Sequence, residues 1–202
     1  MLRRTFLSLA LASLAGPTQA GRHKVVTILG DSITAGLGLP TALAFPAQLQ
    51  VLLRRKDPTL MVRAAGVSGD TTAGGLARLD FSVQSDTTLC ILALGGNDLL
   101  QGLDPKITAT NLAAMVSRLK QRRIGILLTG LRPPAAIGAG YARDVARVYS
   151  DLAKRQHLPF YPDLMAGVGP ALRQGDGLHP TAQGARVIAA GLAPLVLKAA
   201  GS

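Results

Sequence analysis

The sequence has no glutamate, no tryptophan and a single cysteine among its 202 residues. Because all 11 acidic residues are aspartates, zinc proteases of the His-Glu-x-x-His type and calcium loops that close with glutamate are excluded. Cys90 lies in the apolar run 88–94, so no internal disulfide can form and we expect a buried strand residue. The three histidines, His23, His157 and His179, are too few and too scattered to favour a zinc site. We therefore expect neither a metal nor any other cofactor.

Aromatic residues are also scarce, at 3% of the chain, whereas Lys and Arg outnumber acidic residues by 22 to 11. The basic residues are scattered singly or in pairs and are not interleaved with aromatics, which argues against specific nucleic-acid binding. A net charge of +11 still permits weak attraction to an anionic membrane surface. We expect a small-molecule ligand and a monomeric chain.

The first 20 residues have the pattern of a secretory signal peptide. Arg3 and Arg4 precede an apolar stretch from Phe6 to Ala15, and small residues end at Ala20, where we expect cleavage. The apolar stretch is too short to favour a permanent membrane anchor, which is the alternative. The sequence predicts a signal peptide over 1–20, a single domain over 21–202 and a periplasmic or secreted protein. The paired arginines also resemble a twin-arginine export motif, but ordinary export remains at least as well supported.

The remainder alternates between short apolar runs and segments of helical period. The expected strands are continuous apolar runs, which is typical of a parallel sheet covered by helices on both faces. In the helix that begins at Pro105 we expect one apolar face, formed by Ile107, Leu112, Met115, Val116 and Leu119. The expected strands span 24–29, 60–65, 87–94, 124–128 and 158–161, and the expected helices span 45–55, 105–122, 141–155 and 181–200, with Pro194 as a potential kink.

Small and polar residues follow the first three predicted strands. These segments are Gly30-Asp31-Ser32, 66–70 and Gly95-Gly96-Asn97-Asp98. Ligands of open parallel sheets bind at the carboxyl ends of the strands, so the sequence predicts a site there.

Ser32, Asp176 and His179 could form a nucleophilic site. An aspartate three residues before a histidine, across a glycine, can accept the Nδ1 proton of the ring and leave Nε2 free as a base. Ser32 could then be the activated nucleophile, although a serine in this position is more often a helix cap. Asp176 and His179 could likewise belong to an ordinary loop. Taken singly, Gly69 and Asn97 are each more often turn-forming residues. Together they could supply N–H groups to an oxyanion.

Four blocks in order resemble the SGNH hydrolases, also called GDSL-type esterases. They are Gly30-Asp31-Ser32-Ile33-Thr34-Ala35-Gly36, Gly69, Gly95-Gly96-Asn97-Asp98 and Asp176-Gly177-Leu178-His179-Pro180. The stretches 68–72 and 75–79 resemble the periplasmic arylesterase, acyl thioesterase and lysophospholipase subgroup. The resemblance implies a flavodoxin-like three-layer α/β/α sandwich.

The resemblance also implies roles for single residues. Ser32 would be the nucleophile, His179 the base and Asp176 the group that orients it. The oxyanion hole would consist of the Ser32 and Gly69 backbone N–H groups and the Asn97 side chain. Asp70 and Asp98 are expected to stabilise turns, and His23 and His157 to be structural or surface residues.

The implied activity is hydrolysis of acyl esters through an acyl-enzyme, with aryl esters, short to medium acyl esters, acyl thioesters and lysophospholipids as substrate classes. We expect residues 36–40 and 132–140 to wall a shallow apolar groove, because both stretches consist largely of small and apolar residues. One alternative is a carbohydrate O-deacetylase. Another is a non-catalytic periplasmic binding protein whose strand-end glycines hold an anionic ligand.

Overall fold

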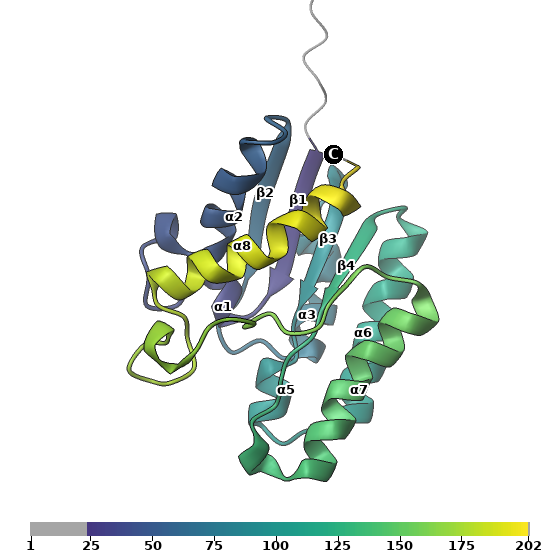
Figure 1. The fold of residues 1–202 in the computed structure, drawn as a ribbon. Coiled ribbons are helices and arrows are strands. Elements are labelled where there is room, and N and C mark those ends of the chain that lie inside the picture. Colours follow the sequence, from purple (N-terminus) through teal and green to yellow (C-terminus); the bar gives the residue numbers. More distant parts are fainter. Residues whose placement is uncertain (1–23, 202) are drawn as a thin grey trace, which may run out of the picture.

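The computed structural model describes residues 24–201, apart from the side chain of Ala135 (Figure 1). The predicted signal peptide, its cleavage site and His23 lie outside the described residues. Within them, no helix has the length and apolar character needed to cross a membrane.

Five parallel strands form one sheet in the order β2-β1-β3-β4-β5. The central strands β1 and β3 are buried along almost their whole length, which explains their continuous apolar runs. Because every pair is parallel, all five carboxyl ends lie at one edge, called here the carboxyl edge. The strands are β1 (Lys24–Gly30), β2 (Leu60–Gly66), β3 (Thr87–Ala93), β4 (Gly125–Thr129) and β5 (Phe160–Tyr161).

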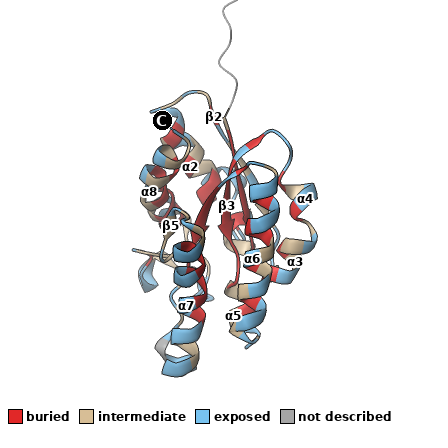
Figure 2. Ribbon diagram, turned by 90° about the vertical axis from the view of Figure 1, so that its right-hand side faces the viewer, coloured by how far each residue is buried: buried red, intermediate tan, exposed pale blue. Residues whose placement is uncertain are grey.

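Helices cover both faces of the sheet and make three layers, as predicted (Figures 1 and 2). On one face α2 (Phe45–Arg54) and α8 (Ala182–Ala199) pack against the sheet through Leu49, Leu53 and Ile188. On the other face α6 (Pro105–Gln121) and α7 (Ala139–Gln156) enclose a second core. Cys90 is fully buried in that second core, which confirms its prediction as a strand residue.

Several short helices follow the strands and were not predicted. Most of them lie at the carboxyl edge, whereas Leu79–Ser82 belongs to the connection that returns to the start of β3. All are too short to show a hydrophobic period, so the sequence pattern did not reveal them. The short α-helices are α1 (Ser32–Ala35), α3 (Thr72–Ala77), α4 (Leu79–Ser82) and α5 (Gly96–Leu100), and the 3₁₀ turns are η1 (Thr41–Leu43), η2 (Ala135–Ile137) and η3 (Pro170–Leu172).

One predicted core residue is misplaced. Ile107 is 48% exposed, and Thr108 is the buried residue in the first turn of α6. Ile107 precedes Leu112 by five residues, which at about 100° per residue separates the two by roughly 140° around the helix. The prediction for Ile107 was therefore wrong, whereas Leu112, Met115, Val116 and Leu119 are buried as expected.

Glycines let α1 pack directly onto the ends of β1 and β2. Gly30 and Gly66 are partners in the sheet register. A Cβ atom added to Gly66 would lie 2.2 Å from the backbone nitrogen of Ala35 and 2.6 Å from the carbonyl carbon of Thr34. Since both contacts are with the backbone of α1, rotation of a side chain cannot relieve them.

We therefore expect Gly66→Ala to displace α1 and to lower the free energy of unfolding by about 1–3 kcal/mol. Gly169→Ala is the matched control, because a Cβ at Gly169 would meet nothing within 4 Å and its φ of −71° suits alanine. Urea unfolding of both variants tests the prediction. Equal stabilities for the two would contradict it.

Candidate active site

Ser32 is the first residue of α1 and directly follows the end of β1. Asp31 caps the helix, because its Oδ1 accepts the N–H of Ile33 at 3.0 Å. Gly36 ends the helix in the left-handed conformation at φ 76°. N–H groups in the first turn of a helix have no intrahelical acceptor. The backbone at Ser32 thus offers a donor beside the hydroxyl.

Asp176 and His179 share a tight loop between η3 and α8. Asp176 Oδ1 accepts the backbone N–H groups of Leu178 and His179 at 2.9 and 3.0 Å, and Asp176 Oδ2 lies 2.6 Å from His179 Nδ1. The hydrogen bond with His179, followed by those two N–H groups, lowers the pKa of Asp176 to about 2. The carboxylate is therefore charged at neutral pH and favours the tautomer with a proton on Nδ1.

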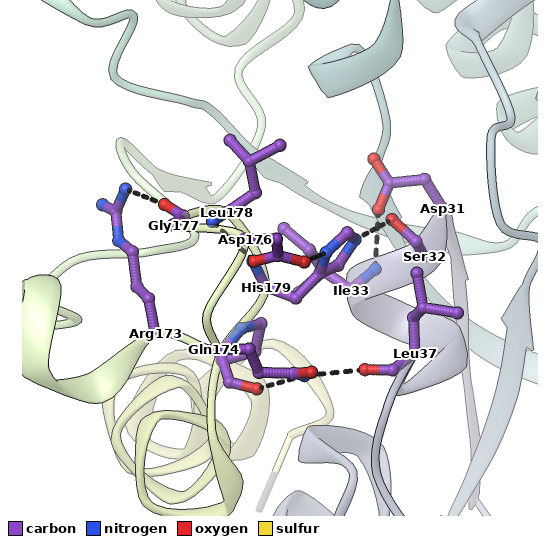
Figure 3. Close-up of polar contacts among 11 residues, drawn as sticks. Asp31, Ser32, Ile33, Leu37, Arg173, Gln174, Asp176, Gly177, Leu178 and His179 are labelled. Atoms are coloured by element: carbon purple, nitrogen blue, oxygen red, sulfur yellow. Dashed lines mark hydrogen bonds and ion pairs between the residues drawn. The ribbon is translucent and has the colours of Figure 1, made fainter.

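The other ring nitrogen meets the serine. His179 Nε2 lies 2.8 Å from Ser32 Oγ, so a hydrogen-bonded line runs from Asp176 through His179 to Ser32 (Figure 3). With Nδ1 protonated, Nε2 accepts the hydroxyl proton. The arrangement can activate a hydroxyl as a nucleophile.

Gly69 and Asn97 lie in the segments that follow β2 and β3, at the same edge. Gly69 is exposed, has φ 84°, and has no atom within 4 Å of the position that a Cβ would take, so its backbone is open to a ligand. Asn97 Nδ2 donates to the carbonyl of Asp70 at 2.8 Å. Since an amide nitrogen carries two hydrogens, this bond fixes the side chain and leaves one N–H to donate.

Asp70 and Asp98 were expected to stabilise turns, but their side chains bind residues at least eight positions away in the chain. His157 has a structural position at the end of a helix. Asp70 Oδ2 accepts from Arg78 Nε at 2.6 Å. Asp98 is buried and accepts from the backbone and hydroxyl of Thr72 and from the Thr108 hydroxyl, which ties α3 and α6 to the end of β3. His157 ends α7 with φ 53°.

Two positioning residues escaped the sequence analysis. The Gln174 side-chain amide donates to the carbonyls of Leu37 and Pro180 at 2.8 and 2.9 Å, and so ties the histidine loop to the segment after the serine (Figure 3). Arg78 donates to the carbonyls of Gly30 and Ala65 at the ends of β1 and β2. A lone loop glutamine carries no sequence signal, whereas Arg78 lies inside the stretch 75–79 that carried the resemblance.

A small cavity of about 60 Å³ opens beside Asp31, at the ends of β1, β3 and β4. The expected walls, 36–40 and 132–140, do not line this cavity. Asp31, Ile33 and Gly96 in its lining belong to the sequence blocks described above, whereas residues 129–131 and 163–165, which also line it, carried no sequence pattern. The lining includes Asp31, Ile33, Leu94, Leu131, Leu164 and Met165. A larger hollow of about 400 Å³ lies between α6 and α7 and is lined mainly by charged side chains.

Asp31, the residue directly before Ser32, is a buried ionisable group. Only 6% of it is exposed. Burial raises the pKa of Asp31 to about 6, although the N–H of Ile33 and the nearby His179 lower it in part. Charging this carboxyl therefore costs free energy in the folded state.

The pKa of Asp31 predicts a pH-dependent stability. An unfolded aspartate titrates near ~4, so the stabilisation from the neutral carboxyl is complete below that pH and is lost as pH rises through about 6. A shift of about two units corresponds to about 3 kcal/mol. In Asp31→Asn the side chain stays neutral and still caps the helix. From about pH 4 to about pH 7, urea unfolding should show the variant gaining up to about 3 kcal/mol relative to wild type. A difference independent of pH would refute this assignment.

Comparisons with known proteins agree on one kind of relative. Residues 28–187 match the GDSL-like Lipase/Acylhydrolase family. The chain is 36% identical to esterase TesA of Pseudomonas aeruginosa, over 89% of this chain and 90% of the relative. It is 35% identical to thioesterase 1/protease 1/lysophospholipase L1 of Escherichia coli (strain K12), over 80% and 78%.

A solved structure agrees with the sequence relatives. The crystal structure of AlinE4, an SGNH-hydrolase family esterase, superposes with a TM-score of 0.74 at 40% sequence identity, covering 89% of this chain and 97% of that one. The matched region contains the whole carboxyl edge together with Ser32, Asn97 and His179. The chain therefore belongs to the GDSL-like lipase/acylhydrolase family, as its sequence blocks predicted.

Proposed function

We propose that this protein is a carboxylic ester hydrolase in which Ser32 is the nucleophile. The observation that carries the proposal is the hydrogen-bonded line from Asp176 through His179 to Ser32, at 2.6 and 2.8 Å. The family and the names of its relatives, which include esterase and thioesterase, support the same chemistry.

The reaction follows from the two ring nitrogens of His179. Ser32 Oγ attacks the carbonyl carbon of the ester or thioester while Nε2 takes the hydroxyl proton. The Asp176 carboxylate, close to Nδ1, stabilises the imidazolium that forms. Nε2 then gives the proton to the departing alcohol or thiol, and the acyl group stays on Ser32. Water, deprotonated by the same nitrogen, attacks the acyl-enzyme. The bond from the acyl carbon to Ser32 Oγ breaks, Nε2 returns the proton to Oγ, and the acid is released.

The negative charge that develops on the carbonyl oxygen needs donors held in place beforehand. We assign this role to the backbone N–H groups of Ser32 and Gly69 and to the Asn97 side chain. The Asp70 carbonyl already fixes Asn97, so its orientation changes little during attack. The left-handed backbone of Gly69 supports the assignment, because its open surroundings let the substrate approach.

We assign the first carbons of the acyl chain to the small cavity, because Asp31 and Ile33, the residues on either side of Ser32, line it. A volume of about 60 Å³ is about that of two water molecules, so it accepts the first carbons and leaves a longer chain to extend outward. Most of its lining residues, including Ile33, Leu131 and Met165, are apolar and suit hydrocarbon. Asp31, Thr129 and Asp163 also line it. Aryl esters, acyl thioesters and lysophospholipids remain the proposed substrate classes.

Two other functions compete. A carbohydrate O-deacetylase would use the same three residues, and acetylated polysaccharide assayed beside simple acyl esters separates the two. A non-catalytic binding protein leaves the line from Asp176 to Ser32 without a purpose. The signal-like segment 1–20 further supports a proposal of export to the periplasm or beyond.

The function is tested by hydrolysis of p-nitrophenyl acetate and p-nitrophenyl butyrate. Ser32→Ala should lower kcat at least about 1000-fold, since the remaining groups can only assist attack by water. Ser68→Ala is the matched control, because Ser68 is an exposed serine beside Gly69 and its loss should leave kcat unchanged. Equal activity of Ser32→Ala and wild type would refute the proposal.

Asp176→Asn should depress kcat by about four orders of magnitude without unfolding the protein, because asparagine favours the wrong tautomer of the histidine. Steady-state kinetics of the variant and wild type check this prediction, and wild-type turnover in Asp176→Asn would mean that His179 needs no carboxylate.

Asn97→Ala should lower kcat about 100- to 1000-fold while changing KM little, because the lost bond forms chiefly in the transition state. Loss of the bond to the Asp70 carbonyl should also lower the free energy of unfolding by about 1 kcal/mol. Turnover and thermal unfolding measured on one preparation distinguish the two effects. Unchanged turnover per folded molecule would leave Asn97 with a structural role alone.

A further inference from the structure

Basic side chains gather at the edge of the sheet opposite the carboxyl edge. The strands begin at this edge, called here the amino edge, and the four long helices α2, α6, α7 and α8 end there (Figure 1). Nine exposed basic side chains lie in the last turns of these helices or within two residues of their ends, and we call them the basic face. They are Arg54, Arg55, Lys56, Arg118, Lys120, Arg123, Lys154, Arg155 and Lys198.

Aspartates near the amino edge do not neutralise the basic face. Three lie there, and each is ion-paired with a basic residue outside the basic face. The pairs are Lys24–Asp57 at 3.1 Å, Arg122–Asp80 at 3.2 Å and Arg63–Asp86 at 2.7 Å. Asp80 also lies 3.7 Å from Arg118. The amino edge therefore keeps a large excess of positive charge.

The carboxyl edge has the opposite balance. Its connections, with the helix turns next to them, hold seven aspartates and five basic residues. The aspartates are Asp31, Asp70, Asp98, Asp104, Asp144, Asp163 and Asp176, and the basic residues are Arg78, Lys106, Arg132, Arg143 and Arg173. An anionic surface attracts the amino edge and repels the carboxyl edge, so charge orients the molecule as well as attracting it.

The parallel fold explains how the basic face arises. A basic residue in the last turn of a helix is stabilised by the negative end of the helix dipole. Because the four long helices all end at the amino edge, this local preference is repeated there four times and yields one positive surface. The dipole alone requires no partner, and its effect appears in the stability of the fold, so binding and stability must be measured separately.

The basic face suits an extended anionic partner better than a small anion. The two hollows described above contain only one of its nine side chains, Arg155. The nine belong to helices on both faces of the sheet, since α2 and α8 cover one face and α6 and α7 the other (Figures 1 and 2). A small anion can meet only a few of them at once, whereas a flat anionic surface meets most of them.

The position of the first strand favours a lipid surface among the extended partners. β1 begins at Lys24, at the amino edge, and the apolar stretch of the expected signal peptide ends at Ala15. The eight residues between them, even fully extended, reach no further than about 32 Å. While that stretch lies in a membrane, the amino edge stays beside the membrane surface. A nucleic acid is disfavoured by the lack of tryptophan and the scarcity of other aromatics.

We propose that the basic face docks this protein onto an anionic lipid surface, with the amino edge toward the lipid and the carboxyl edge toward water. Lysine and arginine side chains near a membrane are attracted by anionic headgroups over about one Debye length. The proposal rests on the proposed function in one respect: Ser32 would face the water, so the docked protein would hydrolyse dissolved esters.

The binding test uses Ser32→Ala protein, which cannot hydrolyse the lipid, so that its result is independent of catalysis. Vesicles of equal parts phosphatidylglycerol and phosphatidylcholine are sedimented with the protein, beside vesicles of phosphatidylcholine alone. We expect binding to the anionic vesicles only, and release in sodium chloride at about 1 M, where the screening length falls to about 3 Å. The triple change Lys56→Gln, Lys154→Gln and Lys198→Gln should weaken binding at least about tenfold.

The matched control is the triple change Lys106→Gln, Arg132→Gln and Arg143→Gln, which removes the same charge from the carboxyl edge. It should alter binding less than about twofold, because those side chains face away from the lipid. Equal losses in the two triple variants would show that net charge alone governs binding and would overturn the proposal. So would unchanged binding of the basic-face variant, or equal binding to both kinds of vesicle. Urea unfolding of both variants reports any loss of helix stability separately.

A second measurement tests the orientation and uses the lack of tryptophan in the chain. Gln121→Trp places a single indole at the amino edge, and Leu100→Trp places one at the carboxyl edge; both positions are exposed. With anionic vesicles that contain dansyl-labelled phosphatidylethanolamine, energy transfer to the dansyl group should be stronger from Gln121→Trp than from Leu100→Trp. Equal or reversed transfer would contradict docking through the basic face.

Hydrolysis of dissolved ester separates this proposal from the proposed function. With Ser32 intact, anionic vesicles should change the hydrolysis of p-nitrophenyl acetate less than about twofold, because the carboxyl edge stays open to water. Strong inhibition by the anionic vesicles would mean that this edge faces the lipid and would overturn the proposed orientation. Failure of wild type to hydrolyse the ester without vesicles would overturn the proposed function and leave the binding and energy-transfer results standing.

Discussion

The hydrogen bond between His179 Nε2 and Ser32 Oγ joins side chains 147 positions apart in the chain. It requires the end of β1 and the loop before α8 to meet at one edge of the sheet with little freedom. Gln174 supplies a direct tie between the two segments, and Gly66 allows α1 to seat closely on β2. Because a shift of about 1 Å can greatly reduce activity in such a site, these packing contacts are part of the chemistry.

The two carboxyl groups that serve the Ser32 region, those of Asp31 and Asp176, have opposite environments. Asp176 accepts three hydrogen bonds and has a low pKa, so it remains charged and orients His179. Asp31 is buried and has a raised pKa, so its charge opposes folding at neutral pH. The charged Asp31 carboxylate thus lowers the stability of the fold directly before Ser32. Groups with such shifted pKa values are common at functional sites.

Much of this arrangement could be predicted from the sequence. Buried parallel strands are continuous apolar runs, so β1 and β3 were clear, and the Asp176–His179 spacing allows one local geometry that the structure contains. The role of Gln174 could not be found, since it depends on a contact with Leu37, far away in the chain. The cavity beside Asp31 likewise depends on residues from separate connections, such as Leu131 and Met165, which only the folded chain brings together.

Covalent labelling tests most directly whether Ser32 is a nucleophile activated by its surroundings. A fluorophosphonate reacts with an activated serine and forms a stable bond to Oγ, and peptide mapping by mass spectrometry locates the label. We expect one label, on Ser32, in the folded protein, and none after denaturation, when Ser32 and His179 are no longer hydrogen-bonded. Absence of label in the folded protein, or a label on another serine, would show that Ser32 is not the activated nucleophile.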